Sequence, residues 1–160
     1  MERQLRPFLD GDLGAWRGLP QLTATDLVAL FGPPSRVEET TLGYYPATRH
    51  TFPAPVPSGG LAAYERDGRI VLIESLSAPA PDVLHALPAP TGTLPQEILL
   101  HDEYAHEYVY AAQGLVVTVA KASGDATDDR IVRYRGVRRL DRLEDFGPDY
   151  YKAFEDQILF

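Results

Sequence analysis

The stretch of sequence that decides the fold runs from Leu61 to Leu76 and reads LAAYERDGRIVLIESL. Asp67-Gly68 in its middle is typical of the two-residue turn of a β-hairpin, because such a turn needs residues that tolerate a left-handed backbone. Ile70 to Ile73 is a continuous apolar run, which indicates a strand covered on both of its faces. The stretch therefore predicts an antiparallel hairpin in the interior of a sheet.

Short strands and helices separated by turn-rich loops are predicted on both sides of this hairpin. The predicted strands, in chain order, are 37–43, 49–52, 61–65, 69–76, 97–101, 104–111, 115–121 and 130–137. The predicted short helices are 1–9, 25–31, 82–87 and 150–158. Thr25 or Asp26 is expected to cap the second helix, because a short side-chain oxygen accepts the free amides of a first turn. Gly32-Pro33 ends that helix, since glycine permits a left-handed exit and proline cannot continue the ladder.

The two halves of the chain have the same order of predicted elements. Residues 26–35 align with 82–91, and Gly60-Leu61 aligns with Gly114-Leu115. We therefore predict an α+β fold made of two tandem units, each a short helix followed by a four-stranded antiparallel sheet, with an additional C-terminal helix. The units are assigned to residues 1–77 and 78–160, which together form one compact domain. Their sheets would either join edge to edge or pack face to face to complete a shared core.

The sequence Leu30-Phe31-Gly32-Pro33 ends a predicted helix directly before the first strand. In this respect the chain resembles the helix and four-strand repeat of the β-lactamase-inhibitor protein fold and of small outer-membrane assembly lipoproteins, over residues 22–76 and 82–137. The resemblance implies a shared fold and favours a binding protein. The inhibitor family usually carries cysteines in its repeats and an export leader. This chain has neither, so no β-lactamase-contacting residue is transferred to it.

The charge and composition of the chain narrow the class of function. There are 15 basic and 23 acidic side chains, a formal net charge of −8, and no cysteine. Lack of cysteine excludes disulfides, thiol nucleophiles and cysteine-ligated metal sites. The negative charge disfavours nucleic acid and suits a basic protein partner. The apolar runs are too short for a membrane span and no export signal is visible, so we expect a cytoplasmic protein without a cofactor.

The densest cluster of chemically active side chains is HDEYAHEY, residues 101–108. Because side chains alternate along a strand, one face is expected to carry His101, Glu103 and Glu107. The other face is expected to carry Asp102, Tyr104, His106 and Tyr108. We expect the end of a strand with one solvated face and predict no catalytic or metal site. The alternatives are a three-ligand site that includes His101 and Glu103, and a pairing of His50 with His106 across the two units.

Six arginines lie between Arg130 and Arg142 of this acidic chain. Arg133 and Arg135 are expected to share a strand face, where their fork-shaped guanidinium groups would bind a carboxylate or phosphate. The alternative is internal pairing with the acidic C-terminal residues, together with protection of an edge strand. Asp125, Asp128 and Asp129 are interpreted as part of a hairpin loop, because the full calcium-loop pattern is missing.

The chain also contains nine tyrosines, and tyrosine is frequent both in β-strands and in binding surfaces. We therefore predict a soluble bacterial-type binding protein of the immunity, inhibitor or adaptor class that uses an acidic, tyrosine-rich sheet face. The predicted contact residues are Tyr44, Tyr45, His101, Glu103, Tyr104, His106, Glu107 and Tyr108. The alternative is a small-molecule-binding protein or enzyme with a pocket between the repeats, using His, Glu and Tyr side chains of residues 101–110.

Overall fold

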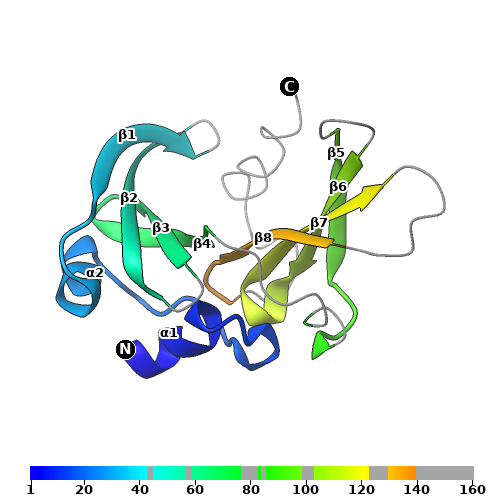
Figure 1. The fold of residues 1–160 in the computed structure, drawn as a ribbon, viewed down its shortest axis with the longest axis horizontal. Coiled ribbons are helices and arrows are strands. Elements are labelled where there is room, and N and C mark those ends of the chain that lie inside the picture. Colours follow the sequence, from blue (N-terminus) through cyan, green and yellow to red (C-terminus); the bar gives the residue numbers. More distant parts are fainter. Residues whose placement is uncertain are drawn as a thin grey trace.

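The computed structural model describes residues 1–42, 45–56, 59–76, 83, 86–98, 103–122 and 130–139. These residues form one eight-stranded sheet in the order β1-β2-β3-β4-β8-β7-β6-β5 (Figure 1). Every neighbouring pair of strands is antiparallel. The strands are β1 (Arg36–Leu42), β2 (Tyr45–Val56), β3 (Gly59–Arg66), β4 (Arg69–Ser75), β5 (Gly92–Ile98), β6 (Glu103–Tyr110), β7 (Leu115–Ala122) and β8 (Arg130–Gly136). The helical elements are α1 (Glu2–Leu9), α2 (Ala24–Phe31) and the 3₁₀ turns η1 (Leu13–Ala15) and η3 (Ala111–Gln113).

The prediction of two units, each with its own helix and four-stranded sheet, is wrong. β4 pairs with β8 through Ile73 opposite Gly136 and Glu74 opposite Arg135, so the two sets of four strands merge into one sheet. The pairing satisfies backbone groups that two separate sheets would leave as open edges. Both described α-helices precede β1, so they do not alternate with the two sets of strands. The predicted helix at 150–158 lies outside the described residues, and half of 82–87 does too.

Seven of the eight predicted strands are confirmed, with different ends for some of them, whereas the strand predicted at 97–101 overlaps β5 only at Glu97 and Ile98. β2 is longer than predicted and β5 begins earlier, because cross-strand pairing continues past the local signal. The central hairpin is confirmed as well, since β3 and β4 pair around Asp67-Gly68. Both turn residues have positive φ, 51° for Asp67 and 76° for Gly68, as a tight hairpin turn of this kind requires.

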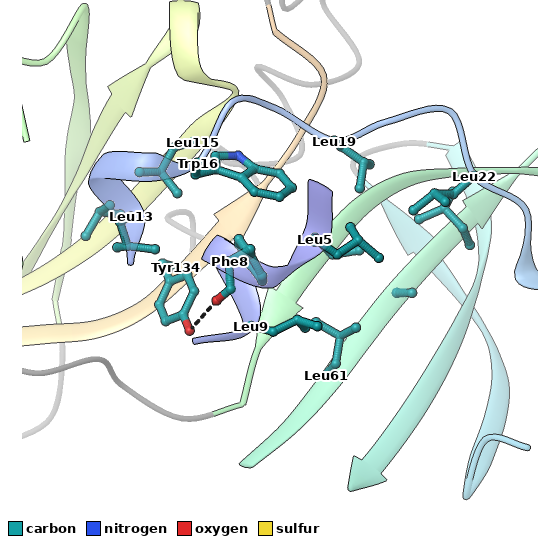
Figure 2. Packing of buried hydrophobic residues seen from close by; sticks show 14 of the residues in the cluster. Leu5, Phe8, Leu9, Leu13, Trp16, Leu19, Leu22, Leu61, Leu115 and Tyr134 are labelled. Carbon is teal, nitrogen blue, oxygen red and sulfur yellow. Dashed lines mark hydrogen bonds between the residues drawn. The ribbon is translucent and has the colours of Figure 1, made fainter. Parts of the chain in front are cut away.

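The main core lies between one face of the sheet and the N-terminal segment (Figure 2). Leu5, Phe8 and Leu9 bury the same side of α1, at the three- and four-residue spacing of an amphipathic helix. The Phe8 ring contacts the rings of Trp16 and Tyr134, at centroid distances of 5.1 and 4.7 Å. The Tyr134 hydroxyl donates a hydrogen bond of 3.0 Å to the Phe8 carbonyl oxygen. The first helix therefore packs directly over β8, where the two halves of the sheet meet.

The close approach at this junction depends on Gly136 of β8. A Cβ atom at this position would lie 2.9 Å from Trp16 Cζ2 and 3.1 Å from Phe8 Cε2 and from Ile73 Cγ1. Those distances are shorter than ordinary side-chain contacts, so only glycine leaves room for the two aromatic rings.

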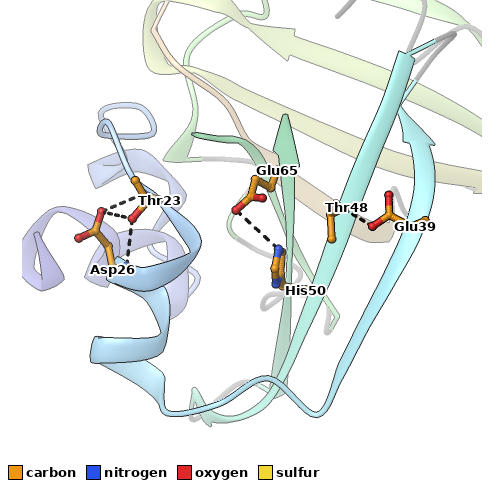
Figure 3. Close-up of polar contacts among 6 residues, drawn as sticks. All are labelled: Thr23, Asp26, Glu39, Thr48, His50 and Glu65. Atoms are coloured by element: carbon orange, nitrogen blue, oxygen red, sulfur yellow. Dashed lines mark hydrogen bonds and ion pairs between the residues drawn. The ribbon is translucent and has the colours of Figure 1, made fainter. Parts of the chain in front are cut away.

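The second helix begins with a capping box (Figure 3). Thr23 Oγ1 accepts a hydrogen bond of 3.2 Å from the Asp26 amide, and the Thr23 amide donates one of 2.8 Å to Asp26 Oδ2. The predicted cap at Thr25 or Asp26 is therefore wrong by two or three residues, because Thr23 is the N-cap and Asp26 is the reciprocal partner. No helix among the described residues is long and apolar enough to cross a membrane.

Candidate functional site

A row of charged and polar side chains crosses the sheet face opposite α1, and we call it the charged row. Strand register places its members on that face, since Glu38 lies opposite Arg49, Arg49 opposite Tyr64, and Glu74 opposite Arg135. The alternation of side chains adds Arg133 on β8, which lies opposite Thr118, and Thr118 lies opposite Glu107. In sheet order the members are Glu38, Arg49, Tyr64, Glu74, Arg135, Arg133, Thr118 and Glu107.

At the β1 end of the row, two guanidinium groups share one carboxylate. Arg36 Nη2 lies 2.7 Å from Glu38 Oε2, and Arg49 Nη1 donates a hydrogen bond of 3.1 Å to Glu38 Oε1. Burial alone would lower the pKa of Arg49, but the hydrogen bond to Glu38 and the interaction with Tyr64 outweigh burial and leave that pKa raised. The Nε of Arg49 has no hydrogen-bond acceptor in the described part of the chain.

Tyr64 continues the row from Arg49 toward Glu74. The Arg49 guanidinium carbon lies 6.0 Å from the centroid of the Tyr64 ring. Burial of the phenol, followed by the negative charge of Glu74, raises the pKa of Tyr64 above its ordinary value. The phenol is therefore neutral at physiological pH and serves as a polar group between two charged ones.

The centre of the row is buried and built from ion pairs. Arg135 Nε donates a hydrogen bond of 2.8 Å to Glu74 Oε2, although the Arg135 side chain is only 2% exposed. Glu107 is also buried; it accepts a hydrogen bond of 2.8 Å from Thr118 Oγ1, and its other oxygen lies 3.6 Å from Arg133 Nη2. A buried ion pair keeps its two side chains together, because separating them would leave each as a buried charge without a counter-charge.

Arg133 and Arg135, predicted as an anion-binding pair, lie on the same sheet face and each contacts a carboxylate of this chain. Protection of an edge strand does not explain them, because β8 lies between β4 and β7 in the interior of the sheet. The acidic C-terminal residues, which were the other predicted partners, lie outside the described residues.

The predicted contact residues of the 101–108 cluster are separated by the strand alternation. Glu107 lies in the charged row, whereas Tyr108 is half-buried against the core on the helix side of the sheet. Glu103, Tyr104 and His106 have described backbone positions on β6, where they pair with Lys121 and its neighbours on β7. Tyr44 and His101 lie outside the described residues.

Tyr45, another predicted contact residue, lies at the start of β2 and is 41% exposed. The Arg66 guanidinium carbon lies 4.5 Å from the centroid of its ring, which is within range of a cation–π interaction. The register places Tyr45 and Arg66 on the same face as the charged row, where β2 begins and β3 ends.

The proposed pairing of His50 with His106 is wrong, because β3, β4, β8 and β7 separate their strands. His50 lies on the helix side of β2 instead, with its Nε2 3.8 Å from Glu65 Oε2 (Figure 3). Beside it, Thr48 Oγ1 donates a hydrogen bond of 3.2 Å to Glu39 Oε1. Within the described ranges, no group of three His, Asp or Glu side chains is arranged to hold a metal ion.

Sequence reasoning missed the first half of the charged row: Glu38, Arg49, Tyr64 and Glu74. Each is a polar residue at an ordinary strand position, and no local motif marks it. The signal becomes visible only when strand order and register are known, because the row joins residues that are up to 97 positions apart, from Glu38 to Arg135.

Comparisons with known proteins show no family for this chain. No family model matches it, and no curated protein matches it. A solved structure that is similar is a DUF4309 family protein, YjgB, from Bacillus subtilis, with a TM-score of 0.44 and 14% sequence identity. The similarity covers 85% of this chain and 97% of that protein. Nothing in these comparisons supports the more specific resemblance to the β-lactamase-inhibitor fold or the assembly lipoproteins.

Proposed function

We propose that the chain is a binding protein of the inhibitor, immunity or adaptor kind, and that it holds a protein partner on the sheet face opposite α1. The observation that carries the proposal is the exposed Tyr45 ring stacked against Arg66 on that face. Tyrosine and arginine are the residue types that most often dominate the energy of protein interfaces, since each combines a large contact area with a polar end.

The charged row supports the same proposal, because it makes the face beside Tyr45 rigid. Arg49, whose side chain is 24% exposed, is held by Glu38 and keeps its conformation without a partner. A partner that meets a pre-organised surface loses less conformational entropy on binding, which leaves more of the contact energy as affinity.

The exposed part of this face lies where β2 begins. Tyr45 is 41% exposed, whereas Leu72, Val116, Glu107 and Arg135 in the middle of the face are each at most 2% exposed. The proposed contact is therefore at the exposed end of the face, beside Tyr45.

The test is affinity capture with the tagged full chain in extract of the organism that encodes it. Three forms are compared: the wild type, Tyr45→Ala, and Val28→Ala as a matched control. Val28 is also an exposed apolar side chain, 38% exposed, but it lies on α2. We expect a protein that the wild type and Val28→Ala retain and that Tyr45→Ala loses. Retention of the same proteins by all three forms would contradict the proposal.

A further inference from the structure

The two edge strands of the sheet, β1 and β5, differ in how regularly they pair with their neighbours. β5 contains Pro95, and its pairing with β6 shifts register between Leu94 and Glu97. β1 contains no proline and pairs with β2 over seven consecutive residues without a shift. Among the described strands β1 pairs with β2 alone, so its other edge carries a regular series of backbone donors and acceptors.

We propose that β1 receives an extended segment of the protein partner as an added strand, with an acidic side chain of that segment bound by Arg36. The inference rests on the proposed function, and it names the kind of segment that the partner supplies. Strand addition of this type gains affinity from main-chain hydrogen bonds and specificity from alternate side chains.

The apolar side of the edge is supplied by Val37. Its side chain is 54% exposed, the largest exposed fraction among the exposed large apolar residues of the described chain. Val37 lies on the opposite face of β1 from Arg36 and Glu38, because neighbouring strand residues alternate. Side chains directly opposite each other on paired strands lie about 5 Å apart, so an added strand with an apolar residue opposite Val37 would bury it.

The charged side of the edge favours a carboxylate. Arg36 and Arg49 share the single carboxylate of Glu38, and the Arg36 side chain is 69% exposed. An acidic residue opposite Arg36 would give the exposed guanidinium a second carboxylate, and the fork-shaped group can bind both. Glu38 would repel an acidic residue placed opposite itself, so the edge selects the position of the charge as well as its sign.

These observations favour a protein segment over a nucleic acid, which also carries negative charge. A phosphodiester backbone can accept hydrogen bonds from amides, but it has no donors for the carbonyl oxygens of β1 and no apolar side chain for Val37. The net charge of −8 also repels a polyanion at long range, whereas a segment with one acidic residue is little affected. The net charge of the whole chain favours a partner that is basic overall. The β1 edge favours a segment of that partner that carries one acidic residue.

The probe for the test is a fluorescein-labelled, end-capped heptapeptide, Thr-Val-Glu-Val-Thr-Asn-Thr. A second peptide with Lys in place of Glu and a single-stranded thymidine decamer are used for comparison. Binding to the full chain is measured by fluorescence anisotropy, and the backbone amides that respond are located by NMR. Two pairs of variants are compared: Arg36→Glu with Arg3→Glu, and Val37→Lys with Val28→Lys. Arg3 is an exposed arginine of α1 and is the control for the same change of charge.

The expected result is that the Glu peptide binds at least about fivefold more tightly than the Lys peptide and perturbs the amides of β1. Arg36→Glu should reverse this preference, and Val37→Lys should weaken both peptides, while Arg3→Glu and Val28→Lys bind like the wild type. Equal effects of Arg36→Glu and Arg3→Glu, amide changes elsewhere, or tighter binding of the decamer would each overturn the inference. Capture of a Tyr45-dependent partner without binding of the Glu peptide would leave the proposed function standing and refute the added strand alone.

Discussion

Trp16 Nε1 donates a buried hydrogen bond of 2.9 Å to the carbonyl oxygen of Gly114, although 98 positions separate the two residues. The same segment makes two further backbone contacts: the Leu19 amide donates to Val137, and the Ile70 amide donates to Leu22. Residues 16–22 therefore bond to β4 on one side of the sheet junction and to the β6–β7 turn and the end of β8 on the other. This segment, packed with α1, gives β2, β3, β4, β6, β7 and β8 a common core.

Trp16→Phe tests how much this bridge contributes. The change removes the hydrogen bond and part of a fully buried ring, so we expect the free energy of unfolding to fall by about 3 kcal/mol. Because Trp16 is the chain's single tryptophan, urea unfolding should be followed by circular dichroism. Val28→Ala, an exposed apolar truncation, should change stability by less than about 0.5 kcal/mol. Equal stability of the two variants would mean that the bridge contributes little.

Gly114→Ala tests the turn that receives this bond. Gly114 has a φ of 61°, and an added Cβ would collide with the carbonyl oxygen of Val137. Gly68 has a φ of 76° with no atom within 4 Å of an added Cβ, so Gly68→Ala is the matched control for left-handed strain. We expect a loss of about 1 kcal/mol for Gly68→Ala and a clearly larger loss for Gly114→Ala, measured by urea unfolding. Similar losses at both positions would show that the Val137 contact relaxes without cost.

Local signals made the strands and the hairpin predictable, but not their order. Asp67-Gly68 and the apolar run from Ile70 predicted a hairpin and an interior strand from neighbouring residues alone, and both are confirmed. The contact of β4 with β8 depends instead on Gly136 admitting the Phe8 and Trp16 rings. No pattern within either half of the chain contains that information, so the sequence could not decide between sheets joined edge to edge and sheets packed face to face.

The same reasoning applies to the candidate site. Tyr45 could be selected from the sequence because tyrosine is common in interfaces, and the alternation of Glu107 and Tyr108 followed from strand geometry. The sharing of Glu38 by two arginines could not be predicted, since it requires the register that places Arg49 opposite Glu38.

Thr23→Ala tests the corrected start of α2. The substitution removes the side chain that accepts the Asp26 amide, so we expect a loss of about 1 kcal/mol in thermal or urea unfolding. Thr25→Ala is the control, because Thr25 is exposed inside the helix and alanine has a higher helix propensity there. It should leave stability unchanged or slightly increased. A larger loss for Thr25→Ala than for Thr23→Ala would place the cap at the position predicted from sequence.

Glu74→Leu tests the centre of the charged row. The change removes the carboxylate from a guanidinium that is 2% exposed, and we expect a loss of about 3 kcal/mol. Adding Arg135→Met should recover most of the loss, because no buried charge then remains at that position. The exposed pair of Arg6 and Glu2, 2.6 Å apart, is the control, and Glu2→Gln should cost less than about 0.5 kcal/mol. No recovery in the double variant would show that Arg135 is held mainly by other contacts.

Tyr64→Phe tests the polar link between Arg49 and Glu74 through its pH dependence. Burial and then the charge of Glu74 raise the pKa of Tyr64 above the ordinary value of 10.0, so the folded chain holds the phenol proton more tightly than the unfolded chain does. This contribution to stability is fully present below pH 10.0 and is lost as the pH rises through the raised pKa. We therefore expect the free energy of unfolding of the wild type to fall above pH 10.0, and to fall less steeply in Tyr64→Phe.

Burial and the neighbouring Tyr108 also raise the pKa of Tyr110, so Tyr110→Phe should reduce the alkaline slope as well. The double variant should be less pH-dependent than either single one, because the two phenols lie on opposite faces of the sheet and act independently. Thr25→Ala, which removes no phenol, should keep the wild-type slope. Stability is measured by urea unfolding at several values between pH 9 and about pH 11, and ultraviolet absorbance reports phenolate formation in the folded chain. An unchanged slope in Tyr64→Phe would show that the Tyr64 phenol titrates alike in the folded and unfolded chain, and would remove it as a neutral link in the charged row.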